Sequence, residues 1–96
     1  MARTQFEWDD RKDEANRVKH GVSFFEAQHA FADPLRVIAR DTTHGVQEER
    51  FYCFGCVAGG VLTVRFTHRA KTIRIIGAGY WRKGKAIYEQ ANHLHE

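Results

Sequence analysis

Apolar and polar side chains alternate along residues 61–69, and this pattern constrains the fold more than any other feature of the chain. Leu62, Val64 and Phe66 fall on one side, with Thr63 and Arg65 between them. Successive side chains of a β-strand point to opposite faces, so the segment is predicted to be a strand with one buried face. Residues 72–78 alternate in the same way. Both runs therefore predict an antiparallel sheet with one face open to water.

Two helices are predicted in the first third of the chain. Asp9 is placed to cap the first helix, which runs to about His20. Gly21 follows it and can adopt the left-handed conformation that ends a helix. Ser23 and Glu26 have the spacing of a capping box and mark the start of the second helix, which stops at Asp33-Pro34.

The remaining elements complete an α+β domain. Further strand-like runs are residues 6–8, 35–40 and 49–57, with a hairpin turn at 58–60 and a last helix over 80–94. Gly84 lies on the apolar stripe of that helix and is expected to let it approach the sheet closely. The order is β-α-α-β-β-β-β-α, with a mostly antiparallel sheet and the helices packed on one face. At 96 residues, the chain is expected to be a single domain over residues 1–96.

Charge is divided unequally between the two halves of the chain. Residues 1–49 carry seven Lys or Arg and ten Asp or Glu, whereas residues 50–96 carry eight and two. The second half is therefore a cationic surface with little internal neutralisation, and such a surface attracts phosphates. Arg65, Arg69 and Arg74 fall on the polar side of the alternating strands. They are expected to form a phosphate-binding floor on the open face of the sheet.

The chain offers no sign of a membrane or export signal. No apolar run approaches the roughly 20 residues that span a bilayer. The N-terminal residues lack the apolar stretch of a secretory signal. We therefore expect a cytoplasmic protein with no membrane partner.

Cys53 and Cys56 form a C-x-x-C pair, which invites a redox or zinc interpretation. A zinc site of this kind needs a second pair of Cys or His ligands, and none is obvious in the sequence. Residues three apart on a strand point to opposite faces, so the two sulfurs diverge unless Gly55 marks a bulge. We therefore favour the interpretation of both cysteines as small hydrophobic residues, and we expect no metal or cofactor.

The corner between the first two helices has two interpretations. Lys19, His20 and Gly21 form a basic last turn followed by a glycine cap, which is ordinary helix termination and explains everything except the histidine. In the second interpretation, Lys19 and His20 lie at the rim of the cationic face. The pattern alone favours the first and leaves the second open.

Short motifs recur along nearly the whole chain in the order of a known family. The more specific ones are Phe6-Glu7-Trp8-Asp9 and Lys19-His20-Gly21-Val22-Ser23-Phe24. Weaker matches are His44, Glu48-Glu49-Arg50-Phe51, Thr67-His68-Arg69, Arg74-Ile75-Ile76 and Tyr88-Glu89. Together they resemble the BrnT family of toxins. The resemblance implies a RelE-like fold and a metal-independent endoribonuclease of a bacterial type II toxin–antitoxin system, which arrests translation. It also implies a BrnA-like, DNA-binding antitoxin that neutralises the toxin in a heteromeric complex.

RNA cleavage through the 2′-hydroxyl needs a base, an acid and cations around the phosphorane. Under the resemblance, the candidate catalytic residues are His20, Lys19, Arg50, Arg69, Arg74, Glu49 and His44. His20 is the leading acid–base candidate, since an imidazole titrates near neutral pH. His44 and Glu49 are second choices, because His44 lies in a polar loop and Glu49 can simply pair with a nearby cation. The candidate RNA-binding residues are Arg65, Arg82, Lys83 and Trp81.

One position departs from the family pattern. Family members commonly continue after Arg-Ile-Ile with Ser-Ala-Arg, but this chain has Gly77-Ala78-Gly79, so the arginine expected at position 79 is missing. Arg82 or Lys83 can supply a charge from the start of the last helix. The alternative is a weakened or inactive basic binding module of the same fold, which docks an acidic antitoxin or nucleic acid.

Overall fold

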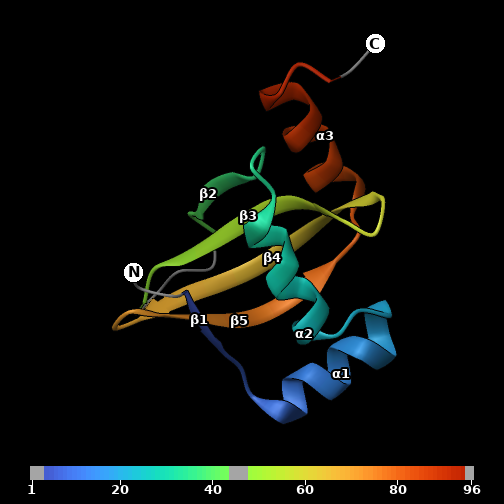
Figure 1. Ribbon diagram of the computed structural model, residues 1–96. Coiled ribbons are helices and arrows are strands. Elements are labelled where there is room, and N and C mark those ends of the chain that lie inside the picture. Colours follow the sequence, from blue (N-terminus) through green and yellow to red (C-terminus); the bar gives the residue numbers. More distant parts are fainter. Residues whose placement is uncertain (1–3, 44–47, 95–96) are drawn as a thin grey trace.

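The computed structural model describes residues 4–43 and 48–94, and its elements follow one another in the predicted order (Figure 1). The strands are β1 (Gln5–Glu7), β2 (Val37–Asp41), β3 (Arg50–Val57), β4 (Gly60–Arg69) and β5 (Thr72–Gly79). The helices are α1 (Asp10–His20), α2 (Phe24–Ala27), which continues as the 3₁₀ helix η1 (Gln28–Ala32), and α3 (Arg82–Ala91). Among these described residues, no helix has both the length and the apolar character needed to cross a membrane.

The five strands form one mixed sheet in the order β1-β5-β4-β3-β2. β1 runs parallel to β5, and the other three pairings are antiparallel. The turn between β3 and β4 places Ala58 and Gly59 at positive φ, 52° and 83°, as a tight hairpin requires. The predicted α+β class and mostly antiparallel sheet are therefore confirmed.

The hydrophobic core lies between one face of the sheet and α2–η1. Leu62, Val64 and Phe66 of β4 point into it and are almost completely buried, as their alternation predicted. Gly55 lets η1 approach on this face, because a Cβ there would overlap the carbonyl oxygen of Ala30. Figure 1 shows α2 in front of the sheet.

α3 packs on the opposite face, so the prediction that the helices share one face is wrong. Phe54 and Thr63 are cross-strand partners that alternate with the core residues. Gly84 of α3 rests against both, and a Cβ there would overlap the Thr63 hydroxyl. The predicted close approach at Gly84 is confirmed. An apolar stripe shows which side of a helix is buried, but it does not show which face of the sheet receives it.

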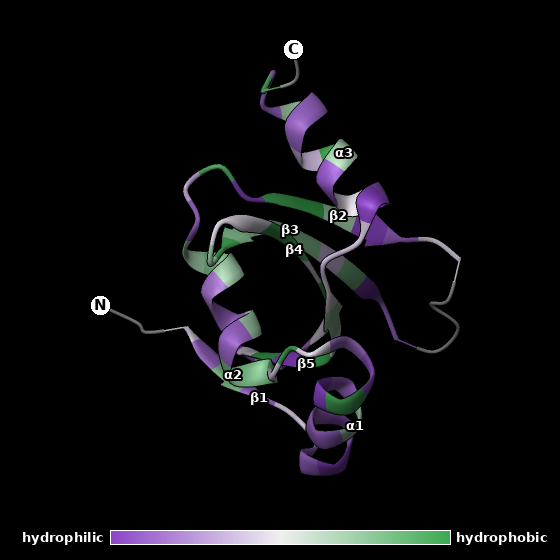
Figure 2. Ribbon diagram, turned by 90° about the vertical axis from the view of Figure 1, so that its right-hand side faces the viewer, coloured by the Kyte–Doolittle hydropathy of each residue, from purple (hydrophilic) through white to green (hydrophobic). Residues whose placement is uncertain are grey.

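α1 covers an edge of the sheet. β1 pairs with only three residues of β5, 72–74, and α1 lies against the strand beyond them. The side chain of Asn16 bonds to the backbone of β5 beyond the end of β1. Its Nδ2 donates to the carbonyl oxygens of Val22 and Ala78, both at 2.9 Å. Its Oδ1 accepts from the Ala78 N–H at 3.1 Å. Figure 2 shows α1 as a mostly hydrophilic helix, consistent with docking through polar contacts.

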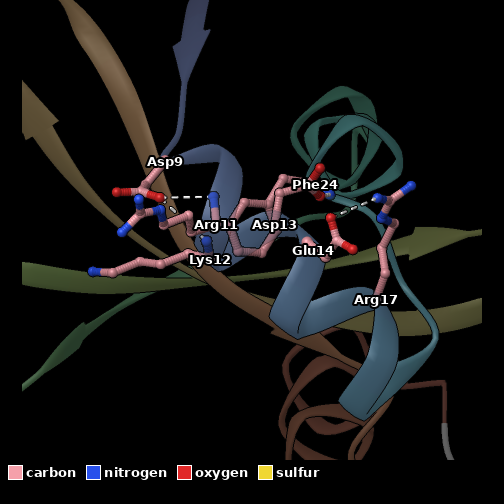
Figure 3. Close-up of polar contacts among 7 residues, drawn as sticks. All are labelled: Asp9, Arg11, Lys12, Asp13, Glu14, Arg17 and Phe24. Carbon is pink, nitrogen blue, oxygen red and sulfur yellow. Dashed lines mark hydrogen bonds and ion pairs between the residues drawn. The ribbon is translucent and has the colours of Figure 1, made fainter.

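Side chains fix both ends of α1, as the sequence predicted. Asp9 Oδ1 accepts from the N–H groups of Arg11 at 2.8 Å and Lys12 at 3.2 Å (Figure 3). Both hydrogen bonds lower the pKa of Asp9, and the one from Lys12 has the larger effect. Gly21 ends the helix with φ 71°. Asp13 then accepts from the Phe24 N–H at 2.8 Å, which joins α1 to the start of α2.

Candidate functional site

Arginines from three strands lie on the face of the sheet opposite the core. We call these residues, Arg50, Arg65, Arg69 and Arg74, the basic face. Thr67 is the register partner of Arg74, and the pairing of Phe51 with Phe66 places Arg50 on the other side of Thr67. The backbones of Arg50 and Arg74 are therefore two strand spacings apart, about 10 Å. Two arginine side chains can reach a common phosphate across that distance.

Carboxylates reduce the charge of two members of the basic face. Arg74 Nη1 donates to Glu7 Oε2 at 2.8 Å, and these side chains are 25% and 39% exposed. Arg50 Nη2 lies 3.9 Å from Glu48 Oε1. Arg65 differs, since its Nε is buried and makes no hydrogen bond to any other group in the described part of the chain. A buried donor of this kind is costly unless a ligand or water satisfies it.

A pocket of about 250 Å³ opens where α1 meets the basic face. Its lining includes Lys12, Lys19 and His20 from α1, Arg65 from β4, and Trp81. We call it the His20 pocket. Three cationic side chains therefore surround a half-buried imidazole, a composition suited to a phosphate group. The structure supports both interpretations of the corner, because Gly21 ends α1 while His20 and Lys19 face the sheet.

Trp81 forms one wall of the His20 pocket and explains the glycine at position 79. The His20 and Trp81 rings meet edge to face, with centroids 5.2 Å apart and planes at 87°. The indole also lies against Gly79, where a Cβ would come within 2.5 Å of Cε2 and Cζ2. The ring thus occupies the space into which a longer side chain at position 79 would project.

The other candidate residues lie outside this pocket. Glu49 pairs with Arg40 at 2.6 Å. Arg40 is the register partner of Phe51, whose ring packs against the core, so this pair lies on the side away from the basic face. Arg82 and Lys83 are exposed at the start of α3. His44 falls outside the described residues.

Two polar residues that line the pocket, Lys12 and Asn16, were not among the candidate site residues. Their signal was their spacing: positions 12, 16 and 19 are i, i+4 and i+7, one stripe of a helix. Tyr52 was also not selected, although it is the cross-strand partner of Arg65. The place of Tyr52 beside Arg65 depends on the register between β3 and β4, which no local sequence pattern specifies.

The two cysteines point to opposite faces of β3, as predicted from their spacing. Cys53 pairs in register with Val64 on the core side, and Cys56 pairs with Val61 on the other side. Burial raises the pKa of the Cys53 thiol to about 12, whereas Cys56 is exposed. Within residues 4–43 and 48–94, no group of three or more His, Cys, Asp or Glu side chains could hold a metal ion.

A comparison with models of protein families identifies the family to which the chain belongs. Residues 8–84 match a family model described as "Ribonuclease toxin, BrnT, of type II toxin-antitoxin system". No curated protein matches the chain. The matched segment begins before α1 and ends in the first turn of α3, so it contains every residue named in the lining of the His20 pocket.

Proposed function

Because the chain belongs to the BrnT family of ribonuclease toxins of type II toxin–antitoxin systems, we propose that it cleaves RNA at the His20 pocket. One observation carries the proposal: the pocket brings His20 and Lys19 of α1 together with Arg65 of β4 at the margin of the basic face. An acid–base group beside several cations is the arrangement that phosphodiester cleavage requires.

In the proposed reaction, the ribose 2′-hydroxyl attacks the adjacent phosphate. The 2′-oxygen loses its proton to a base and bonds to phosphorus. The bond from phosphorus to the 5′-oxygen breaks, and that oxygen takes a proton from an acid. The products are a 2′,3′-cyclic phosphate and a 5′-hydroxyl. His20 is the proposed acid–base group, and the cations in this scheme are side chains, so cleavage proceeds without added metal.

Arg65 and Lys19 are proposed to stabilise the phosphorane, because they line the same pocket as His20. A planar guanidinium can hold two phosphate oxygens at once. Arg50, Arg69 and Arg74 extend the cationic surface away from the pocket and are proposed to hold neighbouring phosphates. Glu49 is left out of this site because of its pair with Arg40 on the other side of the sheet.

A type II toxin acts together with an antitoxin. We propose that the partner is a DNA-binding, BrnA-like protein, that the fold is RelE-like, and that RNA cleavage arrests translation in the cytoplasm. The mixed sheet with helices on both faces and the family match support this assignment.

A second candidate function is a basic module that binds without cleaving. Gly79 favours it, because the indole of Trp81 lies where the family's arginine is expected. The ion pair between Arg74 and Glu7 favours it as well. Such a module would bind RNA in a salt-dependent way and produce no fragments.

The test is cleavage of labelled single-stranded RNA in the presence of a metal chelator. We expect His20→Ala and Arg65→Ala to lower the cleavage rate by about 100-fold or more, while their circular dichroism spectra stay unchanged. Arg11→Ala is the matched control, because Arg11 is exposed and does not line the pocket. Intact RNA with the wild-type protein would favour the binding module.

A further inference from the structure

A second cavity, of about 540 Å³, lies between α3 and the turn that joins β3 to β4. We call it the α3 groove. Trp81 lines both the groove and the His20 pocket, so the two cavities are neighbours that share one residue. We infer that the α3 groove binds the unpaired nucleotides that flank the cleaved phosphate on the same RNA strand. This inference rests on the proposed function, which identifies the bound strand as RNA.

The groove has an aromatic wall suited to nucleobases. Tyr80 and Trp81 line it side by side and remain 46% and 36% exposed. The Tyr80 hydroxyl donates to the Val57 carbonyl oxygen at 3.0 Å, and its ring packs closely over Gly60. The ring is therefore held in place before any ligand arrives. Unpaired bases stack on such platforms with little preference for sequence.

The charge of the groove suits a phosphate backbone. Arg82 and Lys85 line it, and Glu89 is the one acidic residue in its lining among the residues that the structure describes. α3 begins here with no side-chain cap and no acidic residue in its first turn. Cations at the N-terminus of a helix oppose its dipole and lower the stability of the helix. A bound anion at this end would offset that loss. An acidic protein segment would suit the groove less well, since it would leave the exposed rings without stacking partners.

The two cavities define a path for the strand. In the inferred path, a phosphate at Arg65 lies on one side of Trp81, the nucleotide that follows it ends over the indole, and later nucleotides reach Tyr80 and Lys85. A ligand that spans both cavities therefore contains several nucleotides, whereas a dinucleotide, with its one phosphate at Arg65, does not extend beyond Trp81. Binding should depend on groove residues for the longer ligand alone.

The test uses RNA with 2′-O-methyl groups, which lack the attacking hydroxyl and cannot be cleaved. Lys85 lines the groove but not the His20 pocket. We expect Lys85→Glu to weaken binding of a hexanucleotide by about tenfold, because it reverses a charge beside the phosphates, and to leave a dinucleotide unaffected. Arg11→Glu is the matched control, because it makes the same change of charge on an exposed residue outside both cavities. It should leave binding of the hexanucleotide unchanged.

Cys56 provides a second readout that does not depend on a mutation. It is the exposed one of the two cysteines and lines the groove, whereas Cys53 is buried. We expect saturating hexanucleotide to slow alkylation of Cys56 by iodoacetamide about tenfold or more, through burial beneath a stacked base. The dinucleotide should leave the alkylation rate unchanged.

Either of two results would overturn the inference: equal hexanucleotide affinity for wild type and Lys85→Glu, or unchanged alkylation of Cys56 in the saturated complex. Protection of Cys56 by an antitoxin, where RNA gives none, would assign the groove to the protein partner instead. None of these measurements involves cleavage. A wild-type protein that binds the hexanucleotide through the groove but cuts no RNA would therefore refute the proposed activity and leave the groove assignment standing.

Discussion

At the scale of single residues, Gly79 and Trp81 form one packing unit. The indole is in contact with the glycine and with the His20 ring. The missing arginine at position 79 was readable from the sequence, but the ring that fills its space was not. That contact depends on how the chain turns from β5 into α3, which no local pattern specifies. Arg65 was placed on the correct face by alternation, yet its proximity to His20 required the tertiary structure.

We expect Gly79→Ala to lower the free energy of unfolding by about 1–3 kcal/mol, because the new methyl group overlaps the indole. In a Trp81→Ala background the same change should cost much less, and urea denaturation of the four proteins measures this coupling. Gly77→Ala is the matched control on the same strand, where a Cβ meets only Asn16 Oδ1, at 4.0 Å. Equal costs of Gly79→Ala in both backgrounds would contradict the packing account.

At the scale of elements, capping and alternation gave the helices and strands, with shifts of a few residues at their ends. Asp9, Gly21 and the Ser23–Glu26 box mark helix boundaries through local hydrogen bonds, so the sequence contained that information. The placement of α1 on a sheet edge and of α3 on the second face depends on contacts between distant residues. Asn16 and Ala78, for example, are separated by 62 positions.

The docking of α1 depends on Asn16. We expect Asn16→Asp to lower the free energy of unfolding by about 2–4 kcal/mol, since a carboxylate would face the carbonyl oxygens of Val22 and Ala78 in place of the donating amide. Thermal denaturation measures the loss, and RNA binding should weaken with it because α1 supplies His20. Glu14→Gln, an exposed change in the same helix, should stay within about 0.5 kcal/mol of wild type. Similar effects of the two changes would argue against the role of Asn16.

At the scale of the whole molecule, Asp33 joins the two sides of the fold. Its carboxylate accepts from the Tyr88 hydroxyl at 2.6 Å, the Cys56 N–H at 2.7 Å and the Leu35 N–H at 2.8 Å. These bonds tie α3 and β3 to the loop that follows η1. Burial opposes ionisation of Asp33, but the hydrogen bonds outweigh it and lower its pKa. The hydrogen bond to Asp33, together with burial, raises the pKa of Tyr88 to about 12.

The raised pKa of Tyr88 gives stability a specific dependence on alkaline pH. Between the unfolded value of 10.0 and about 12, the folded protein keeps a proton that the unfolded chain has lost. The free energy of unfolding should therefore fall as pH rises through this range. Tyr88→Phe should have a shallower fall, measured by urea denaturation at several pH values. Ionisation of Cys53 affects both proteins alike, so the difference in slope reports Tyr88. Identical slopes would contradict this assignment.

The outer strands of the sheet are short. β1 has three residues and β2 has five, and α1 lies against β5 beyond the end of β1. An added chain would find only a brief row of backbone donors and acceptors on either side, and β2 carries the charged residues Arg40 and Asp41. Short outer strands that carry charges disfavour edge-to-edge pairing between molecules, which is the step by which sheets extend into fibrils.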